Sequence, residues 1–387
     1  MLQRPLKLNC AYQRYDWGTQ SDIPTLIGLP HPGGDLPLAE YWMGAHPGLP
    51  SRVSETGIAL NALIEKYPLE ILGRHHARLH NALPYLFKVL SAARALSIQV
   101  HPNKEQAEAG FKKERAAGIT PSSLNCNYKD DNHKPELLVA LTPFTAMVGF
   151  RTRHDIAGLF RQLACQALLP WAQKLESDAD ALADLYRWLL YLDGDELHAL
   201  CRDAIEHSTQ LQGSCWPWIK NLHDIFGDDA GVLFPLLLNV FTLQVGQGVY
   251  LDAGIPHAYL QGTGLEVMAS SDNVLRGGLT KKYMDREELI KITRFDAPPC
   301  EILVGQRDEN RLRFEVPCPD FQFEIIEVDR NVEIGDSDSA ELILILAGSI
   351  QLGDEQLVRG ECALLPAALG RVSLKGKGKL ARVTSAL

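Results

Sequence analysis

The sequence has few of the features that mark membrane, disulfide-rich and nucleic-acid-binding proteins. Its longest apolar run, residues 232–240, is interrupted by Pro235 and is far shorter than the roughly 20 residues that cross a membrane. The eight cysteines are scattered and form no C-x-x-C pair, so we expect reduced, mainly structural thiols. A formal net charge of −10 is opposite to the basic excess that nucleic acids and anionic membranes attract.

The N-terminus also lacks the apolar stretch of a signal peptide, so the sequence predicts a cytoplasmic protein. We expect a monomer without nucleic-acid or membrane partners. At 387 residues the chain is too long for one hydrophobic core, and 46% hydrophobic with 22% charged residues is ordinary globular usage. Two or three folded domains are therefore expected.

The composition of the chain and the spacing of its apolar residues change twice along the sequence. Residues 1–50 are rich in glycine, proline and aromatics, which favours short strands and ordered loops. Within 153–235, apolar residues recur at helical spacing, as in Ile156, Leu159, Phe160 and Leu163, which predicts a helical insert. Beyond residue 296, short strand-like segments with glycine turns indicate an antiparallel sandwich or jelly roll. We therefore divide the chain into one β domain (1–152 and 236–295), a helical insert (153–235) and a second β domain (296–387).

Residues 96–101 form the stretch around which the candidate chemistry gathers. Apolar residues alternate there with Ser97, Gln99 and His101, so a strand would turn these three to one face. Pro102 and Asn103 end the strand, and a helix is predicted over 104–117. A histidine two residues from an amide at a strand end supplies half of a metal site.

Two later segments offer further metal ligands. Glu136 follows a dense polar block and begins a buried strand, and His257 follows Gly254-Ile255-Pro256. Imidazole and carboxylate suit Zn²⁺ and related ions, whereas an amide such as that of Gln99 is a weaker ligand. Each histidine could equally be a buried residue with one hydrogen bond, and Glu136 could instead pair with Lys134.

Taken together, these segments resemble the type I mannose-6-phosphate isomerases (phosphomannose isomerases) of the cupin superfamily. The resemblance covers nearly the whole chain in order, through the segments 15–18, 42–47, 96–104, 132–136, 254–259 and 265–276. It implies a mainly β fold, in which a cupin or jelly-roll catalytic domain carries an inserted α-helical domain and is followed by a second, C-terminal jelly-roll domain.

The resemblance also implies a site and a reaction. One zinc ion per chain would be held by Gln99, His101, Glu136 and His257. The substrate would be a small-molecule sugar phosphate, because the family interconverts mannose 6-phosphate and fructose 6-phosphate in mannose metabolism.

Moving a proton between C1 and C2 of an open-chain sugar needs a base and a positive charge beside the enediolate oxygen. Arg276 would supply charge, and the candidates for proton transfer are His133, Lys134, Glu266 and Asp272. Lys134 could instead pair with a phosphate or with Glu136. His133 could assist ring opening or be an exposed loop histidine.

The substrate's phosphate needs local donors in a chain of net charge −10. The resemblance implies Ser97, Lys88, Arg276 and Lys282 for this role, with Trp17 and Tyr259 as pocket walls. One position departs from the family, because its Gly-Leu-Thr-Pro-Lys reads Gly-Leu-Thr-Lys-Lys over 278–282, which removes a rigid proline before Lys282. The region after residue 296 contains no histidine, so a scaffolding role is expected for it.

Two other classes of function fit the same fold. A cupin metal enzyme of another reaction class, such as an oxygenase, would hold a redox metal and would need no phosphate donors. A non-catalytic sugar-phosphate-binding cupin would bind its ligand without hydrogen exchange at C2.

Overall fold

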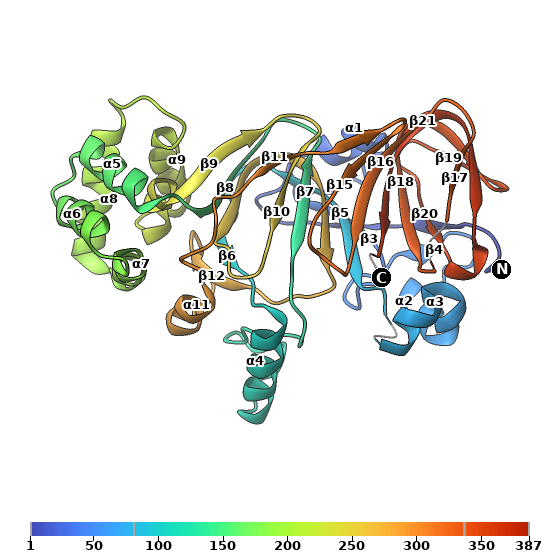
Figure 1. Ribbon diagram of the computed structural model, residues 1–387, viewed down its shortest axis with the longest axis horizontal. Coiled ribbons are helices and arrows are strands. Elements are labelled where there is room, and N and C mark those ends of the chain that lie inside the picture. Colours follow the sequence, from blue (N-terminus) through green and yellow to red (C-terminus); the bar gives the residue numbers. More distant parts are fainter. Residues whose placement is uncertain (1, 80–81, 336–337, 386–387) are drawn as a thin grey trace.

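The computed structural model describes residues 2–79, 82–335 and 338–385. Three regions follow one another along its long axis: a block of helices, a central sheet and a second sheet at the opposite end (Figure 1). The predicted mainly β fold with a helical insert is confirmed. In the described ranges, the helices are all too short or too polar to cross a membrane.

The central sheet, here called the site sheet, is antiparallel, and its main path runs in the order β13-β10-β7-β11-β5-β3-β2. Its strands are β2 (Ala11–Gln13), β3 (Glu40–Met43), β5 (Tyr85–Ala92), β6 (Ile98–Val100), β7 (Glu136–Ala140), β8 (Phe144–Phe150), β9 (Leu238–Leu243), β10 (Gln247–Leu251), β11 (His257–Ala269), β12 (Leu275–Gly278) and β13 (Ile302–Val304).

Strand β11 connects the two parts of this sheet. Its first residues pair with β6 and β8, and its later residues pair with β5 and β7. Between them the strand passes close to another segment at Gly262, where a Cβ atom would lie 2.7 Å from the Cα of Phe144. A residue without a side chain, at φ 129°, is required at this crossing.

The second, C-terminal sheet runs in the order β14-β15-β16-β21-β18-β20-β1-β4, with β17 on β21 and β19 on β18. Its strands are β1 (Leu6–Asn9), β4 (Arg52–Val53), β14 (Gln306–Asp308), β15 (Arg311–Phe314), β16 (Gln322–Val328), β17 (Val332–Ile334), β18 (Glu341–Leu352), β19 (Glu355–Val358), β20 (Cys362–Leu365) and β21 (Val372–Thr384). Strand β1, in the first predicted β domain, pairs with β20 of the second, and β13 of the second pairs with β10 of the first. Strand pairing therefore crosses the predicted domain boundary in both directions. The boundaries themselves stay predictions.

One apolar core joins the two sheets. The ring centroids of Phe87 on β5 and Phe323 on β16 lie 6.1 Å apart. The Tyr85 hydroxyl donates a hydrogen bond to the carbonyl oxygen of Ala340, at 2.8 Å. Because these contacts are buried, the C-terminal sheet is fixed against the back of β5.

The chain leaves the site sheet after β8 and returns at β9. Between them lies the helical block, formed by α5 (Arg153–Leu163), α6 (Leu169–Ser177), α7 (Ala181–Tyr191), α8 (Gly194–Ser208), α9 (Trp216–Phe226), the 3₁₀ turn η1 (Ala230–Leu233) and α10 (Phe234–Leu237). Ile98 and Val100 of β6 share an apolar core with these helices. The opposite, polar face of β6 is thereby left for the site.

The remaining helices lie outside the helical block. They are α1 (Asp22–Ile27), α2 (Leu60–Lys66), α3 (Pro68–Leu79), α4 (Lys104–Ala116), α11 (Arg286–Ile292) and the 3₁₀ turn η2 (Ala367–Leu369). Helix α4 begins where the sequence predicts, because Asn103 and Gln106 form a reciprocal capping box.

Candidate metal centre and catalytic cleft

Three buried side chains converge where β6, β7 and β11 meet. His101 follows β6, Glu136 begins β7 and His257 begins β11, and their ligand atoms all lie within 4.8 Å of one another. The Nε2 of His101 is 3.5 Å from Oε1 of Glu136, and the Nε2 of His257 is 3.6 Å from Oε2 of the same carboxylate. This set can hold a metal ion.

The imidazole rings are oriented for a cation. The Nδ1 of His101 lies 2.7 Å from the carbonyl oxygen of Asn273, and that of His257 lies 2.9 Å from the carbonyl oxygen of Ile255. A carbonyl can only accept, so each Nδ1 donates and each Nε2 keeps its lone pair. Among the described residues, the buried Nε2 of His101 has no hydrogen-bond partner. Burial lowers the pKa of both rings, which keeps them neutral and able to bind metal.

Gln99 lies at the centre of β6. Its register partners are His257 on β11 and Arg276 on β12. The strand is shorter than predicted, because it covers only Ile98–Val100, and Ser97 and His101 flank it. Beyond His101 the backbone leaves the ladder, where the His101 carbonyl accepts a hydrogen bond from the amide of Gly254 at 2.8 Å.

A cleft of about 60 Å³ opens beside the metal-ligand cluster. It brings together three of the four predicted ligands and five other predicted site residues. The lining comprises Glu40, Lys88, Leu90, Leu96, Ser97, Gln99, Lys134, Glu136, His257, Ala258, Tyr259 and Glu266. Gln99 therefore contributes its side chain to the cleft wall, next to two of the converging ligands, and the third converging residue, His101, is almost fully buried.

Lys88 lies in a buried group of opposite charges. Its Nζ is 2.9 Å from Oε2 of Glu266 and 3.3 Å from Oε1 of Glu40. The Tyr259 hydroxyl donates to Oε1 of Glu266, at 2.9 Å. Burial alone would lower the pKa of Lys88, but Glu266 and Glu40 outweigh it and raise the pKa above its ordinary value. Lys88 is thus a fixed cation that already has two carboxylate partners.

Lys134 forms an ion pair with one of the converging ligands. Its Nζ lies 3.4 Å from Oε1 of Glu136, and only 10% of its side chain is exposed. The ion pair that the sequence leaves open is therefore present. The same ammonium also lines the cleft.

Arg276 and Lys282 carry positive charges that no salt bridge in the described ranges neutralises. Over the described ranges, neither side chain makes an ion pair or a hydrogen bond. Desolvation lowers the pKa of Arg276, and desolvation together with the charges of Arg276 and Lys129 lowers the pKa of Lys282. Cations gathered in this way are suited to an anionic ligand.

The loop before Lys282 is anchored by the helical block. Oδ1 of Asp229 accepts hydrogen bonds from the amides of Leu279 and Gly231, each at 2.8 Å. The bond to the amide of Leu279 fixes the loop a few residues before Lys281, the residue that replaces the family's proline.

Six predicted site residues lie outside the lining of the cleft: His101, Arg276 and Lys282, described above, and also His133, Asp272 and Trp17. The Nε2 of His133 is 2.7 Å from Oδ2 of Asp320. The Asp272 carboxylate lies 3.3 Å from Nε2 of His46, whose hydrogen bond lowers the pKa of Asp272 to about 2. Trp17 stacks on Tyr15, with ring centroids 5.5 Å apart. The side chains of His133, Asp272 and Trp17 thus each already have a defined partner.

Sequence reasoning missed two buried polar residues. Glu40 joins Lys88 and also accepts a hydrogen bond from the Trp42 indole, at 3.0 Å. Asn273 holds the loop before β7 through the amide of Lys129, at 2.7 Å, while its carbonyl orients His101. Both residues lie in or beside segments that resemble the family, which is the only signal that could have found them.

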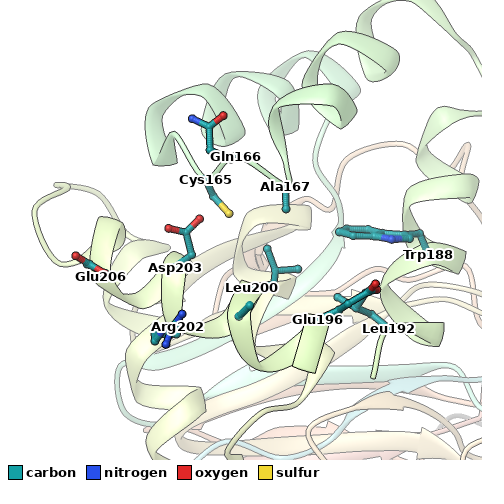
Figure 2. A pocket seen from close by; sticks show the side chains of 11 residues that line it. Cys165, Gln166, Ala167, Trp188, Leu192, Glu196, Leu200, Arg202, Asp203 and Glu206 are labelled. Carbon is teal, nitrogen blue, oxygen red and sulfur yellow. The ribbon is translucent and has the colours of Figure 1, made fainter. Parts of the chain in front are cut away.

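A larger pocket, of about 500 Å³, lies on the helical block. Figure 2 shows the Cys165 thiol pointing toward the Asp203 carboxylate, with Trp188 on the opposite wall. Burial raises the pKa of Cys165 to about 12, and Asp203 adds to the effect, so this thiol is a poor nucleophile. The pocket contains none of the converging ligands.

All eight cysteines of the chain are free thiols, as expected.

Comparisons with known proteins agree with this geometry. Residues 5–153 match the family model "Phosphomannose isomerase type I, catalytic domain", and residues 310–385 match "Mannose-6-phosphate isomerase, cupin domain". The chain is 41% identical to the mannose-6-phosphate isomerase of Escherichia coli K12, over 98% of this chain and 100% of that enzyme. It is 30% identical to the enzyme of Rattus norvegicus, over 97% and 93%.

Solved structures show the same likeness. A zinc-bound mannose 6-phosphate isomerase superposes with a TM-score of 0.92 at 39% identity, covering 99% of this chain and 100% of that chain. A mutant phosphomannose isomerase from Salmonella typhimurium superposes with a TM-score of 0.93 at 40% identity and the same coverage. The chain therefore belongs to the type I phosphomannose isomerases, a family of aldose–ketose isomerases.

Proposed function

We propose that this protein is a zinc-dependent mannose-6-phosphate isomerase that interconverts mannose 6-phosphate and fructose 6-phosphate. The observation that carries the proposal is the buried convergence of His101, Glu136 and His257 beside a cleft that also contains Lys134 and Glu266. Full-length relatives with this activity in their names, and a zinc-bound relative of the same fold, support it.

One zinc ion per chain would be held by His101, Glu136 and His257, with Gln99 as the fourth ligand. The free Nε2 lone pair of His101 and the shared carboxylate of Glu136 fit such an ion. When bound, zinc supplies a Lewis acid for the oxygens on C1 and C2 of the open-chain sugar.

The reaction removes the proton from C2 of the aldose, passes through an enediolate and returns a proton to C1. Two side chains in the cleft, Glu266 and Lys134, are suited to carry this proton, because they line the cleft beside the ligands. Arg276, opposite Gln99 in the strand register, would stabilise the negative charge that develops on the enediolate.

The phosphate would lie toward the unpaired cations. Lys282 and Arg276 would balance its charge, and the Ser97 hydroxyl would donate to it from the cleft wall. The fixed cation Lys88 would keep Glu266 in place, and Tyr259 would form a wall of the cleft. The expected monomer, the cytoplasmic location and the role in mannose metabolism remain predictions.

A coupled assay tests the proposal. The protein should convert mannose 6-phosphate, lose this activity with a chelator and regain it with zinc. In deuterated water, fructose 6-phosphate should acquire deuterium from the solvent. Binding of the sugar phosphate without exchange would instead favour a non-catalytic cupin, and oxygen consumption with bound iron would favour an oxygenase.

A further inference from the structure

One contact joins the loop that precedes β7 to the C-terminal sheet. The Nε2 of His133 lies 2.7 Å from Oδ2 of Asp320, with only 23% and 13% of the two side chains exposed. His133 stands directly before Lys134 and three residues before Glu136. A residue just before β16 of the C-terminal sheet is thereby linked to the segment that supplies a cation and a metal ligand.

Asp320 is itself held in a fixed position. The next residue, Phe321, is fully buried in the core shared by the two sheets. Strand β16 begins one residue later, and its Phe323 contacts Phe87 of the site sheet. The Asp320 carboxylate therefore has a defined distance from the strands that carry the site.

The loop is anchored at two other points. The side-chain amide of Asn273 donates to the carbonyl oxygen of Asn132, at 2.9 Å, and the amide of Ala269 donates to the carbonyl oxygen of Pro135, at 3.1 Å. These bonds fix the backbone on either side of His133. Asp320, in the segment that leads into β16, is the partner that fixes the His133 side chain.

We propose that Asp320 is a positioning residue for the metal centre. Its carboxylate accepts a hydrogen bond from the Nε2–H of His133 and so fixes the segment from His133 to Glu136. The ammonium of Lys134 and the carboxylate of Glu136 then meet the histidine ligands in the observed arrangement. In this proposal, which rests on the proposed function, His133 acts as a hydrogen-bond donor and transfers no proton to the sugar.

Side chains that keep or remove the hydrogen bond provide the test. In His133→Gln the side-chain amide can still donate to Asp320, and in Asp320→Asn the carbonyl oxygen can still accept. His133→Ala and Asp320→Ala remove the bond. Asp329→Ala is the matched control, because Asp329 is an exposed aspartate directly after β16.

Zinc affinity, measured by competition with a chromophoric chelator, is the first readout. His133→Ala and Asp320→Ala should each lose about 10-fold in affinity, as expected when a group that orients a metal ligand is removed. The double variant should lose no more than either single variant, because both break one contact. His133→Gln, Asp320→Asn and Asp329→Ala should stay within about threefold of wild type, well inside that loss.

Turnover of mannose 6-phosphate is the second readout, and kcat should fall in the two alanine variants and recover in His133→Gln. A His133→Gln variant as impaired as His133→Ala would show that the imidazole itself transfers a proton, and would overturn the proposal. Unchanged zinc affinity in Asp320→Ala would overturn it as well, even if its melting temperature fell. The zinc measurement needs no substrate, so it decides the proposal even if wild type fails to isomerise mannose 6-phosphate.

Discussion

Lys88 and Glu266 are register partners on β5 and β11, and their side chains form an ion pair of 2.9 Å across the two strands. Both side chains are at least 90% buried. The pair is therefore a cross-strand contact in which two buried charges neutralise each other. Because both side chains are buried, water cannot take the place of either partner.

Removing this cation should destabilise the protein strongly. Lys88→Met leaves Glu40 and Glu266 buried without their positive partner, which we expect to cost about 3–5 kcal/mol in the free energy of unfolding. Urea unfolding at neutral pH measures the loss. The double variant Lys88→Met with Glu266→Gln should recover part of it, and a loss below about 1 kcal/mol in the single variant would contradict the buried pairing.

The metal centre predicts a joint loss of metal and activity. His101→Ala removes one of three converging ligands, so bound zinc should disappear and kcat should fall by about 100-fold or more. Metal analysis and the isomerase assay are carried out on the same sample. His154→Ala, at an exposed histidine of α5, is the control, and full turnover by a zinc-free His101→Ala protein would refute the role of the site.

The pair formed by Asp272 and His46 predicts a pH-dependent effect on stability. The hydrogen bond from His46 lowers the pKa of Asp272 to about 2, below the value of about 4 in an unfolded chain. The pair therefore contributes stability above about pH 4, and this contribution is lost as the pH falls toward 2.

Asp272→Asn should accordingly cost less than about 1 kcal/mol at pH 6, because 43% of this side chain is exposed, and still less at pH 3. Urea unfolding of both proteins at the two pH values measures the difference. An equal cost at pH 6 and pH 3 would show that the carboxylate charge contributes nothing.

The loop that carries Lys282 predicts an effect of the helical block on substrate affinity. Asp229→Ala removes the acceptor that holds the amide of Leu279, so Lys282 should lose its fixed position. We expect KM for mannose 6-phosphate to rise about 10-fold with a smaller change in kcat, and inhibition by inorganic phosphate to weaken in parallel.

Lys282→Met serves as the matched variant for this effect. It should raise KM at least as much as Asp229→Ala, and the double variant should be no worse than Lys282→Met alone, since both changes act on one contact. Additive effects of the two substitutions would place Asp229 in another role.

The resemblance to the family, and not the spacing of the residues alone, named His101, Glu136 and His257 as ligands, and the structure brings these three together. Strand alternation at Ser97 and Gln99 placed both side chains correctly in one cleft. The strand itself is shorter than its pattern suggests, since pairing with β12 and the single pair with β11 limit it to three residues.

The partners of several site residues could not be predicted. Glu40 meets Lys88 because β3 pairs with β5, and Asp320 meets His133 across 187 positions because two sheets share one core. Contacts of this kind depend on how the sheets pack, which local propensity and periodicity do not encode. The resemblance to the family named His133 as a site residue, but it gave no indication of Asp320.

The central position of β11 has a consequence for how the chain folds while it is being synthesised. Strands β5 and β7 leave the ribosome more than 100 residues before β11, which pairs with both of them. The helical block, whose contacts are local, can fold in the interval. During this time the edges of β5 and β7 that pair with β11 stay unpaired. Nascent chains that stop before residue 257 should therefore aggregate readily and need chaperones, until β11 pairs with β5 and β7 and brings His257 to the metal centre.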